Sequence, residues 1–283
     1  MMENPYPKNS SMEYVTVSKD KERFMNFAWL HSVWRMNTVN PFLHNYDPET
    51  NTLKETHIAP FPQELAHRLI DLYSEKGDIV LDPFCGSGTT NFMALSLFRK
   101  TIGYDIEEKY IRMAAQRCAN RGAFFCKSSA SMNEIADVSV QLCITSPPYL
   151  YLRHYSDNPN NIGNLKNPYF QLRRVFEEIF RVLRYDGYFC LNVSDVPEEG
   201  RRKLTTFPYD LIYVCMDIGF QLMDTIIWDK EIVLKKWNME NRRIKRNHEY
   251  IWVFRKPRQP GNQVAWQSNA IMGELQRLAA LTK

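Results

Sequence analysis

Apolar positions recur with helical and strand periods from residue 61 onward. Leu65, Leu69 and Leu72 fall on one face of a helix, and Gly77 marks its end. The apolar run at 78–81 then predicts a buried strand. The elements expected next are a helix, a strand and a helix, at 93–98, 101–104 and 110–119. This β-α-β-α order predicts an α/β fold with a doubly wound, mostly parallel sheet.

The alternation continues in the second half of the chain. A strand at 138–144 precedes a proline-containing turn, and an amphipathic helix over 172–183 is expected to stop at Asp186 and Gly187. The later elements are expected as a strand, a helix and two strand-like runs, at 188–193, 207–216, 221–228 and 248–255. A long basic loop separates the last two runs, which therefore predict a C-terminal antiparallel hairpin.

The pattern weakens at both ends and predicts appendages to a main domain at 61–258. Residues 1–60 have no period and place aromatic side chains among Asn and Pro residues. We expect an irregular extension that packs onto the core and serves as a candidate DNA contact. A hinge at 259–262 leads to a tail helix expected within 259–283.

Composition narrows the function classes only slightly. The net charge of +4 and the pI near 8.6 are mildly basic and do not by themselves indicate a nucleic-acid-binding protein. The six cysteines form no closely spaced pair and no cluster with histidine, so free thiols and no metal site are expected. Because no run of about 18 apolar residues is present, we expect a cytoplasmic protein with no membrane segment.

A glycine-rich turn follows the first predicted strand. Gly86 and Gly88 come shortly after Asp82, and glycine lets the backbone pass close to a ligand. Asp105 ends the next strand, where an acidic residue commonly accepts hydrogen bonds from ribose hydroxyls. Asn91 stands where a dinucleotide fold would have a third glycine, which favours S-adenosylmethionine over NAD. A tight turn without a ligand is the competing interpretation, and Asp105 weakens it.

A second turn, Ser146-Pro147-Pro148-Tyr149, follows the strand at 138–144. The two prolines fix φ, so the Ser146 hydroxyl and the Pro147 carbonyl are held rigidly. Hydrogen bonds from an exocyclic amine to these two oxygens would localise the nitrogen lone pair for attack, and the Tyr149 ring could stack on an extruded base. A surface turn without a ligand would be the simpler interpretation of this string alone.

Together the two turns resemble those of amino-group DNA methyltransferases, which methylate cytosine N4 or adenine N6. Ser146 makes the second turn similar to the N4-cytosine type, because adenine enzymes usually have Asp or Asn there. The resemblance runs from about Phe61 to Lys256 and includes the late strand at 248–255. It implies a Rossmann-like sheet of the seven-stranded type, S-adenosylmethionine as cofactor and double-stranded DNA as substrate. The implied cofactor residues are Phe61, Pro62, Asp82, Phe84, Gly86, Gly88, Thr89 and Asp105.

Two departures from the family pattern bear on recognition. Ser128 and Ser129 stand where an acidic residue often contacts the adenine, and no room is left for a separate target-recognition domain. The loop at 230–247 is the strongest substitute, because its seven Lys and Arg against two Glu give +5, more than the whole chain. A solvated surface loop is the alternative. The candidate DNA-binding residues are Lys235, Lys236, Trp237, Arg242, Arg243, Lys245 and Arg246.

The expected function is transfer of a methyl group from S-adenosylmethionine to the N4 amine of a flipped cytosine in DNA, with Ser146, Pro147, Pro148 and Tyr149 as catalytic residues. A cytosine-C5 mechanism is excluded because none of the six cysteines follows a proline. Three alternatives stay open: adenine N6 in DNA, cytosine N4 in RNA, and a DNA-binding subunit on an inactive scaffold. The partners considered are a second copy of the chain and a cognate restriction endonuclease.

Overall fold

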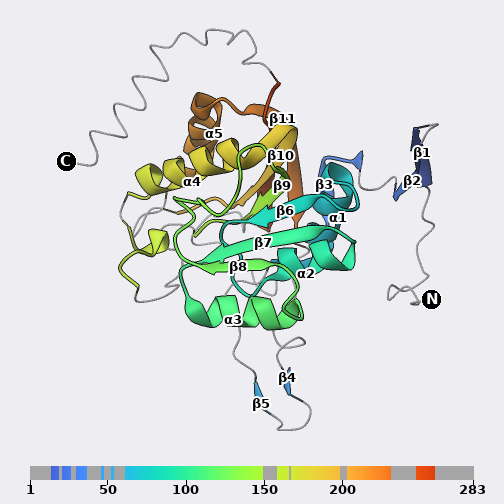
Figure 1. Ribbon diagram of the computed structural model, residues 1–283. Coiled ribbons are helices and arrows are strands. Elements are labelled where there is room, and N and C mark those ends of the chain that lie inside the picture. Colours follow the sequence, from blue (N-terminus) through green and yellow to red (C-terminus); the bar gives the residue numbers. More distant parts are fainter. Residues whose placement is uncertain are drawn as a thin grey trace.

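The computed structural model describes residues 14–18, 21–26, 30–36, 46–47, 52–53, 61–148, 158–165, 167–197, 203–230 and 247–258. Its centre is one eight-stranded sheet with helices on both faces (Figure 1). This architecture confirms the expected α/β class, with one strand more than the seven-stranded type. No helix within the described ranges is long and apolar enough to cross a membrane.

The strands of this sheet do not follow the order of the chain. They lie as β3 (Val33–Arg35), β11 (Gln221–Asp229), β12 (His248–Arg255), β10 (Leu183–Val193), β9 (Val140–Thr145), β6 (Ile79–Asp82), β7 (Lys100–Asp105) and β8 (Ala123–Cys126). The five strands from β10 to β8 run parallel, and β12 pairs antiparallel with β10 and β11, which confirms the predicted C-terminal hairpin. The chain order reverses between β6 and β9, where open α/β sheets bind ligands.

Helices cover the two faces unequally (Figure 1). One face carries α1 (Gln63–Tyr73) and α2 (Thr89–Ser96), with α3 (Glu108–Arg117) beside α2, and the other carries α4 (Tyr169–Val182) and α5 (Phe207–Ile218). A short 3-10 helix, η3 (Ile162–Asn164), precedes α4. The apolar spacing predicted for α1 is the observed one, because Leu65 and Leu69 are fully buried. Ser74 ends this helix by donating its N–H and its hydroxyl to the Ile70 carbonyl.

The segment before residue 61 contains strands that its sequence did not predict. β1 (Tyr14–Ser18) pairs antiparallel with β2 (Lys21–Asn26), β4 (Tyr46–Asp47) pairs with β5 (Thr52–Leu53), and β3 joins the main sheet parallel to β11. Irregular structure was therefore the wrong expectation for these residues. The two- and three-residue strands β3, β4 and β5 pair through backbone groups and are too short to leave a periodic signal in the sequence. Packing onto the core is confirmed for Trp34 of β3, which is buried in the apolar cluster of the face that carries α1 and α2 and lies under the Arg68 guanidinium of α1.

The end of α4 is a second correction. The sequence predicts a stop at Asp186 and Gly187, but α4 ends at Val182 and β10 begins at Leu183. The Lys256 ammonium donates to the backbone oxygens of Arg181 and Leu183, at 3.3 and 2.9 Å, and so binds carbonyls that another helical turn would need. A side chain more than 70 residues away thus ends the helix. The tail helix expected within 259–283 lies outside the described residues.

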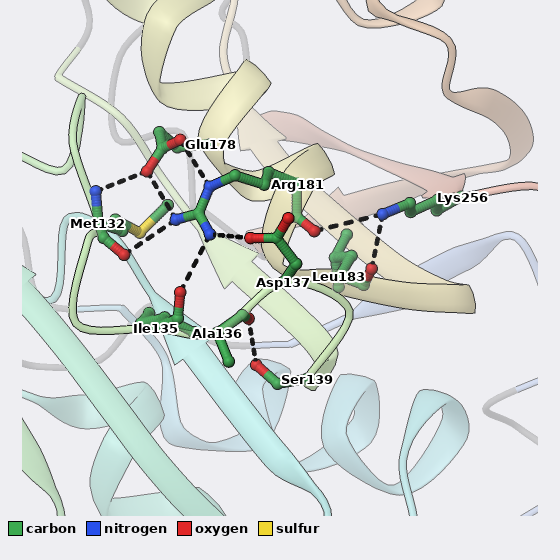
Figure 2. A network of polar contacts seen from close by, with 9 residues as sticks. All are labelled: Met132, Ile135, Ala136, Asp137, Ser139, Glu178, Arg181, Leu183 and Lys256. Atoms are coloured by element: carbon green, nitrogen blue, oxygen red, sulfur yellow. Dashed lines mark hydrogen bonds and ion pairs between the residues drawn. The ribbon is translucent and has the colours of Figure 1, made fainter.

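A polar network holds the last turn of α4 against the segment before β9 (Figure 2). The Arg181 guanidinium donates to both carboxylate oxygens of Glu178, at 2.8 and 2.9 Å, and to the backbone oxygens of Met132 and Ile135. Glu178 also accepts the Met132 N–H at 2.6 Å. Because β9 begins a few residues later, this network fixes the start of the strand whose far end carries the second predicted turn.

Candidate active site

Both predicted turns lie at the edge of the sheet where the parallel strands end. Asp82 is the last residue of β6, Asp105 is the last residue of β7, and Ser146 directly follows β9. One cleft at this edge is lined by residues from both turns, among them Phe84, Asp105, Glu107, Ser146 and Pro148. The structure therefore brings the glycine turn and the proline turn to a single site.

Asp82 connects the two turns directly. Its Oδ1 accepts the Phe84 N–H at 3.1 Å and the Thr145 hydroxyl at 2.8 Å, so one carboxylate holds the glycine turn and the end of β9. The residue is only 5% exposed, and this burial raises the pKa of its carboxyl to about 6. The hydrogen bonds oppose that rise but do not cancel it. Near neutral pH the site therefore holds a buried negative charge.

Asp105 holds the glycine turn from the neighbouring strand. Its Oδ2 accepts the Gly86 N–H at 3.0 Å, and its Oδ1 accepts the Glu107 N–H at 2.9 Å. Burial raises the pKa of this carboxyl to about 6 as well. A carboxylate has about four acceptor positions, so the backbone contacts from Gly86, Ile106 and Glu107 leave capacity for a ligand. Asp105 thus fixes the turn and lines the cleft at the same time.

Gly88 begins α2 in the left-handed region, with φ of +75°. A Cβ at this position would lie 2.7 Å from Ala114 Cβ and 2.9 Å from Ala114 Cα of α3. The space that a side chain would fill is therefore occupied by a neighbouring helix. Gly88 lets α2 and α3 approach each other, and this approach sets the start of α2 behind the cleft.

We expect Gly88→Ala to lower the free energy of unfolding by about 3 kcal/mol, from backbone strain plus the clash with α3. Gly77→Ala is the matched control, because Gly77 also has a positive φ of +87°, but a Cβ added there would have no other atom within 4 Å. Gly77→Ala should lower the free energy of unfolding only by the backbone strain, about 1 kcal/mol. Chemical denaturation of both variants measures the difference. Equal losses would show that the contact with Ala114 contributes nothing.

The proline turn is described through Pro148. The Ser146 hydroxyl accepts a hydrogen bond from the Asn192 side-chain amide at 3.4 Å, and Ser146 and Pro148 line the cleft. Tyr149 lies outside the described residues, as do the seven candidate DNA-binding residues of the basic loop. The loop's two ends are described: the Lys230 N–H donates to the Asn247 carbonyl at 2.7 Å, at the same edge of the sheet as Ser146.

Of the expected cofactor residues, all of which the structure describes, only Phe84 and Asp105 line this cleft. Asp82, Gly86 and Gly88 lie behind it, and three others lie farther along the chain or the helices. Thr89 is buried at the start of α2 and accepts from the Arg117 guanidinium at 2.9 Å. Pro62 is the residue before α1, and Phe61 packs partly buried against the side chains of α1 and α2. Among the described residues, these side chains support the elements around the glycine turn.

Several polar residues of the site were not predicted. Glu107 lines the cleft, and its Oε1 is buried without a hydrogen-bond partner among the described residues. Asn192 and Glu249 lie within the apolar strands β10 and β12 and meet beside Ser146. A polar residue inside an otherwise apolar strand was the available signal, but only the strand register shows what it contacts.

Cys85 does not have the properties of a nucleophile. Its thiol is buried, donates to the Gly86 carbonyl at 3.8 Å and packs where a Cβ on Gly103 would come within 3.0 Å. Burial raises the pKa of this thiol well above its ordinary value. Cys85 is therefore a small packing residue within the glycine turn.

A family model described as DNA methylase matches residues 3–116 and 140–279 of this chain. The type II methyltransferase M.HpaI of Haemophilus parainfluenzae is 31% identical over 177 residues, which cover 59% of this chain and 55% of that protein. The DNA adenine methyltransferase YhdJ of Escherichia coli is 38% identical over 86 residues, or 30% of this chain and 26% of that protein. A solved TehB-like SAM-dependent methyltransferase of Corynebacterium glutamicum superposes with a TM-score of 0.46 and 17% identity, covering 70% of this chain and 90% of that one. The matched regions thus span about half or less of the curated relatives.

Proposed function

We propose, because the chain belongs to the DNA methylase family matched by its residues 3–116 and 140–279, that it methylates the N4 amine of cytosine in double-stranded DNA. The cofactor expected from the sequence, S-adenosylmethionine, is confirmed by the family match. The observation that carries the proposal is the shared cleft, in which Ser146 and Pro148 lie together with Phe84 and Asp105. A methyl donor and an acceptor amine could meet there.

The residues of the cleft fit an adenosine-containing cation. The buried Glu107 Oε1 can accept a hydrogen bond from a ligand hydroxyl, and Asp105 beside it has acceptor capacity beyond its backbone contacts. Phe84 and Ile106 add apolar surface for a flat ring. The buried carboxylates of Asp82 and Asp105 would be stabilised by a positive charge nearby. We propose these residues as the cofactor-binding set, together with the backbone of Gly86.

The bound cofactor supplies an activated methyl group. The acceptor amine is a weak nucleophile, because its lone pair is conjugated with the ring. Hydrogen bonds from its N–H groups to the Ser146 hydroxyl and the Pro147 carbonyl would localise that lone pair for direct attack. Pro147 and Pro148 fix φ and so keep these oxygens in place. Orientation therefore supplies much of the catalysis, and the methylated amine then releases one proton to solvent.

Cytosine is favoured over adenine by one residue. Ser146 opens the turn, where adenine enzymes usually have Asp or Asn. Adenine N6 stays the second candidate, because one relative is described as a DNA adenine methyltransferase. The intact Ser146, Gly86 and Asp105 support an enzyme over an inactive binding subunit.

DNA contact is proposed for the basic loop at 230–247, which leaves and rejoins the sheet beside the cleft. β11 ends at Asp229 and β12 begins at His248, and these two residues pair at the edge that carries Ser146. The loop's net charge of +5 would bind the phosphate backbone there. We place the protein in the cytoplasm with its DNA. A second copy of the chain and a cognate restriction endonuclease are its proposed partners.

The proposal is tested by offering labelled S-adenosylmethionine with duplex DNA and, separately, with structured RNA. We expect label in the DNA only. Label in RNA alone would overturn the assignment of the acceptor. Cofactor binding without transfer to either nucleic acid would instead support the inactive scaffold.

Cofactor binding should weaken as the pH falls through about 6. Burial raises the pKa of Asp82 and of Asp105 to about 6, so both are ionised at pH 7.5 and mostly protonated at pH 5. A cation binds the ionised forms, so its Kd should rise by about tenfold per pH unit below 6 for each carboxylate that must ionise. Calorimetry over pH 5 to 8 measures the trend, and a flat profile would contradict it.

Unfolding does not explain the expected loss of cofactor binding at low pH, because the carboxyl groups of Asp82 and Asp105 affect folding stability in the opposite direction. Their pKa values are higher in the folded chain than in the unfolded chain, so the folded state binds more protons between about pH 4 and 6. These two carboxyl groups therefore stabilise the cofactor-free fold as the pH falls through that window. A thermal melt at each pH is the control for the binding series.

A further inference from the structure

A row of polar side chains crosses the carboxyl edge of the sheet and ends at Ser146. Lys230 follows β11 and forms an ion pair with Glu249 of β12. Asn192 of β10 donates from its side-chain amide to Glu249 Oε2 at 2.5 Å and to Ser146 Oγ at 3.4 Å. One connected chain of contacts therefore crosses the four neighbouring strands β11, β12, β10 and β9. Glu249 and Asn192 lie within their strands, whereas Lys230 and Ser146 directly follow theirs.

This row is buried where apolar residues would be expected. Glu249 is 8% exposed and Asn192 is 2% exposed, and their strand neighbours Ile251, Val253 and Cys190 belong to the apolar core. Burying a carboxylate costs stability unless it is paired and hydrogen-bonded, and a well-packed apolar set is often at least as stable. Glu249 has both kinds of partner, an ammonium and an amide. Stability alone therefore does not explain the choice of residues, whereas the contact with Ser146 offers a reason.

We propose that Glu249 is a positioning residue for methyl transfer and acts on the reaction through Asn192 and Ser146. An ionised carboxylate accepts hydrogen bonds only, so it selects the orientation of Asn192 in which the NH2 group points toward it. In that orientation the same NH2 group also donates to the Ser146 hydroxyl. Lys230 pairs with the carboxylate and holds it in place. This inference rests on the proposed function, in which Ser146 orients the acceptor amine.

The consequence for Ser146 follows from the direction of its contact with Asn192. A serine hydroxyl can both donate and accept. When Asn192 donates to the hydroxyl oxygen, the hydroxyl proton is not drawn toward Asn192. If the Asn192 amide turned over, its oxygen would face Ser146 and draw the hydroxyl proton toward the strand. The hydroxyl would then be turned away from the cleft, and the amine would lose a rigid acceptor.

The test is Glu249→Gln, which keeps the shape of the side chain but adds a donor that can bond to the Asn192 oxygen. We expect kcat to fall by about 10- to 100-fold, while the cofactor Kd and the melting temperature stay close to wild type. Glu108→Gln is the matched control, because Glu108 is an exposed residue of α3 paired with Arg112. Unchanged kcat in Glu249→Gln would overturn the inference.

A double-mutant cycle separates positioning from a merely structural role. If Glu249 acts through Ser146, Glu249→Gln should cost almost nothing further in a Ser146→Ala background, so the two losses will not multiply. Independent losses that multiply would show that Glu249 acts elsewhere and would overturn the inference. Asn192→Asp should mimic the loss in the wild-type background, because it replaces the donor with an acceptor.

A neutron crystal structure of Glu249→Gln, which locates hydrogen atoms, decides the inference even if the protein methylates no DNA. We expect the Ser146 hydroxyl or the Asn192 amide to change orientation relative to the wild-type protein. Unchanged positions for both would overturn the positioning role. Wild-type protein that transfers no methyl group to DNA would instead overturn the proposed function, and the two failures are therefore distinguishable.

Discussion

Ser146→Ala is expected to lower kcat for DNA methylation by about 100-fold or more, with the cofactor Kd within about twofold of wild type. The hydroxyl is one of two proposed acceptors for the amine N–H groups, and the Pro147 carbonyl remains in the variant. Removing one acceptor leaves the amine planar, with its lone pair conjugated with the ring. The loss should therefore appear in the chemical step.

Single-turnover kinetics with labelled cofactor measure this effect, because they separate methyl transfer from product release. Ser96→Ala is the control, since Ser96 is exposed on α2 and its hydroxyl donates only to the Phe92 carbonyl of the same helix. It should leave the rate unchanged. A Ser146→Ala variant with a normal transfer rate would remove Ser146 from the mechanism. A large rise in the cofactor Kd would reassign it to cofactor binding.

Asp105→Ala is expected to raise the cofactor Kd by about 100-fold or more. The change removes a carboxylate from the cleft and releases the N–H groups of Gly86 and Glu107, which Asp105 holds at 3.0 and 2.9 Å. The glycine turn would then lose the anchor that ties it to β7. Both effects weaken the same binding site, so this loss should be the largest of any single cofactor contact.

Isothermal calorimetry at pH 7.5, where Asp105 is ionised, measures the Kd. Asp217→Ala is the matched control, because Asp217 lies at the end of α5 and pairs with Arg173 on the other face of the sheet. It should bind the cofactor as tightly as the wild-type protein does. If Asp105→Ala also bound normally, the cofactor would have to occupy a different part of the molecule.

The sheet could be predicted because its elements alternate regularly and carry clear apolar signals. The helix α1 repeats apolar residues at the helical period and β6 is an apolar run, and the structure places both as expected. The edge strand β3 could not be predicted, since three residues carry no period and pair only with the distant β11. The end of α4 was misplaced for a similar reason, because Lys256 of a later segment binds its last carbonyls.

The candidate site was predictable where its residues lie close together in the sequence. The glycine turn and the proline turn each lie within a few residues, and the parallel strands bring their ends together. The row behind Ser146 depends on register instead. Asn192 pairs with Ile251, which places Glu249 within hydrogen-bonding distance. The sequence around either residue does not predict that pairing.

The measurement that tests the central claim most directly is the identity of the methylated nucleoside. Duplex DNA is incubated with the protein and labelled S-adenosylmethionine, digested to nucleosides and separated by liquid chromatography with mass detection. Ser146→Ala protein provides the background. We expect the label in N4-methylcytosine. Label in N6-methyladenine would contradict the assignment of the base, and label in C5-methylcytosine would contradict the proposed mechanism.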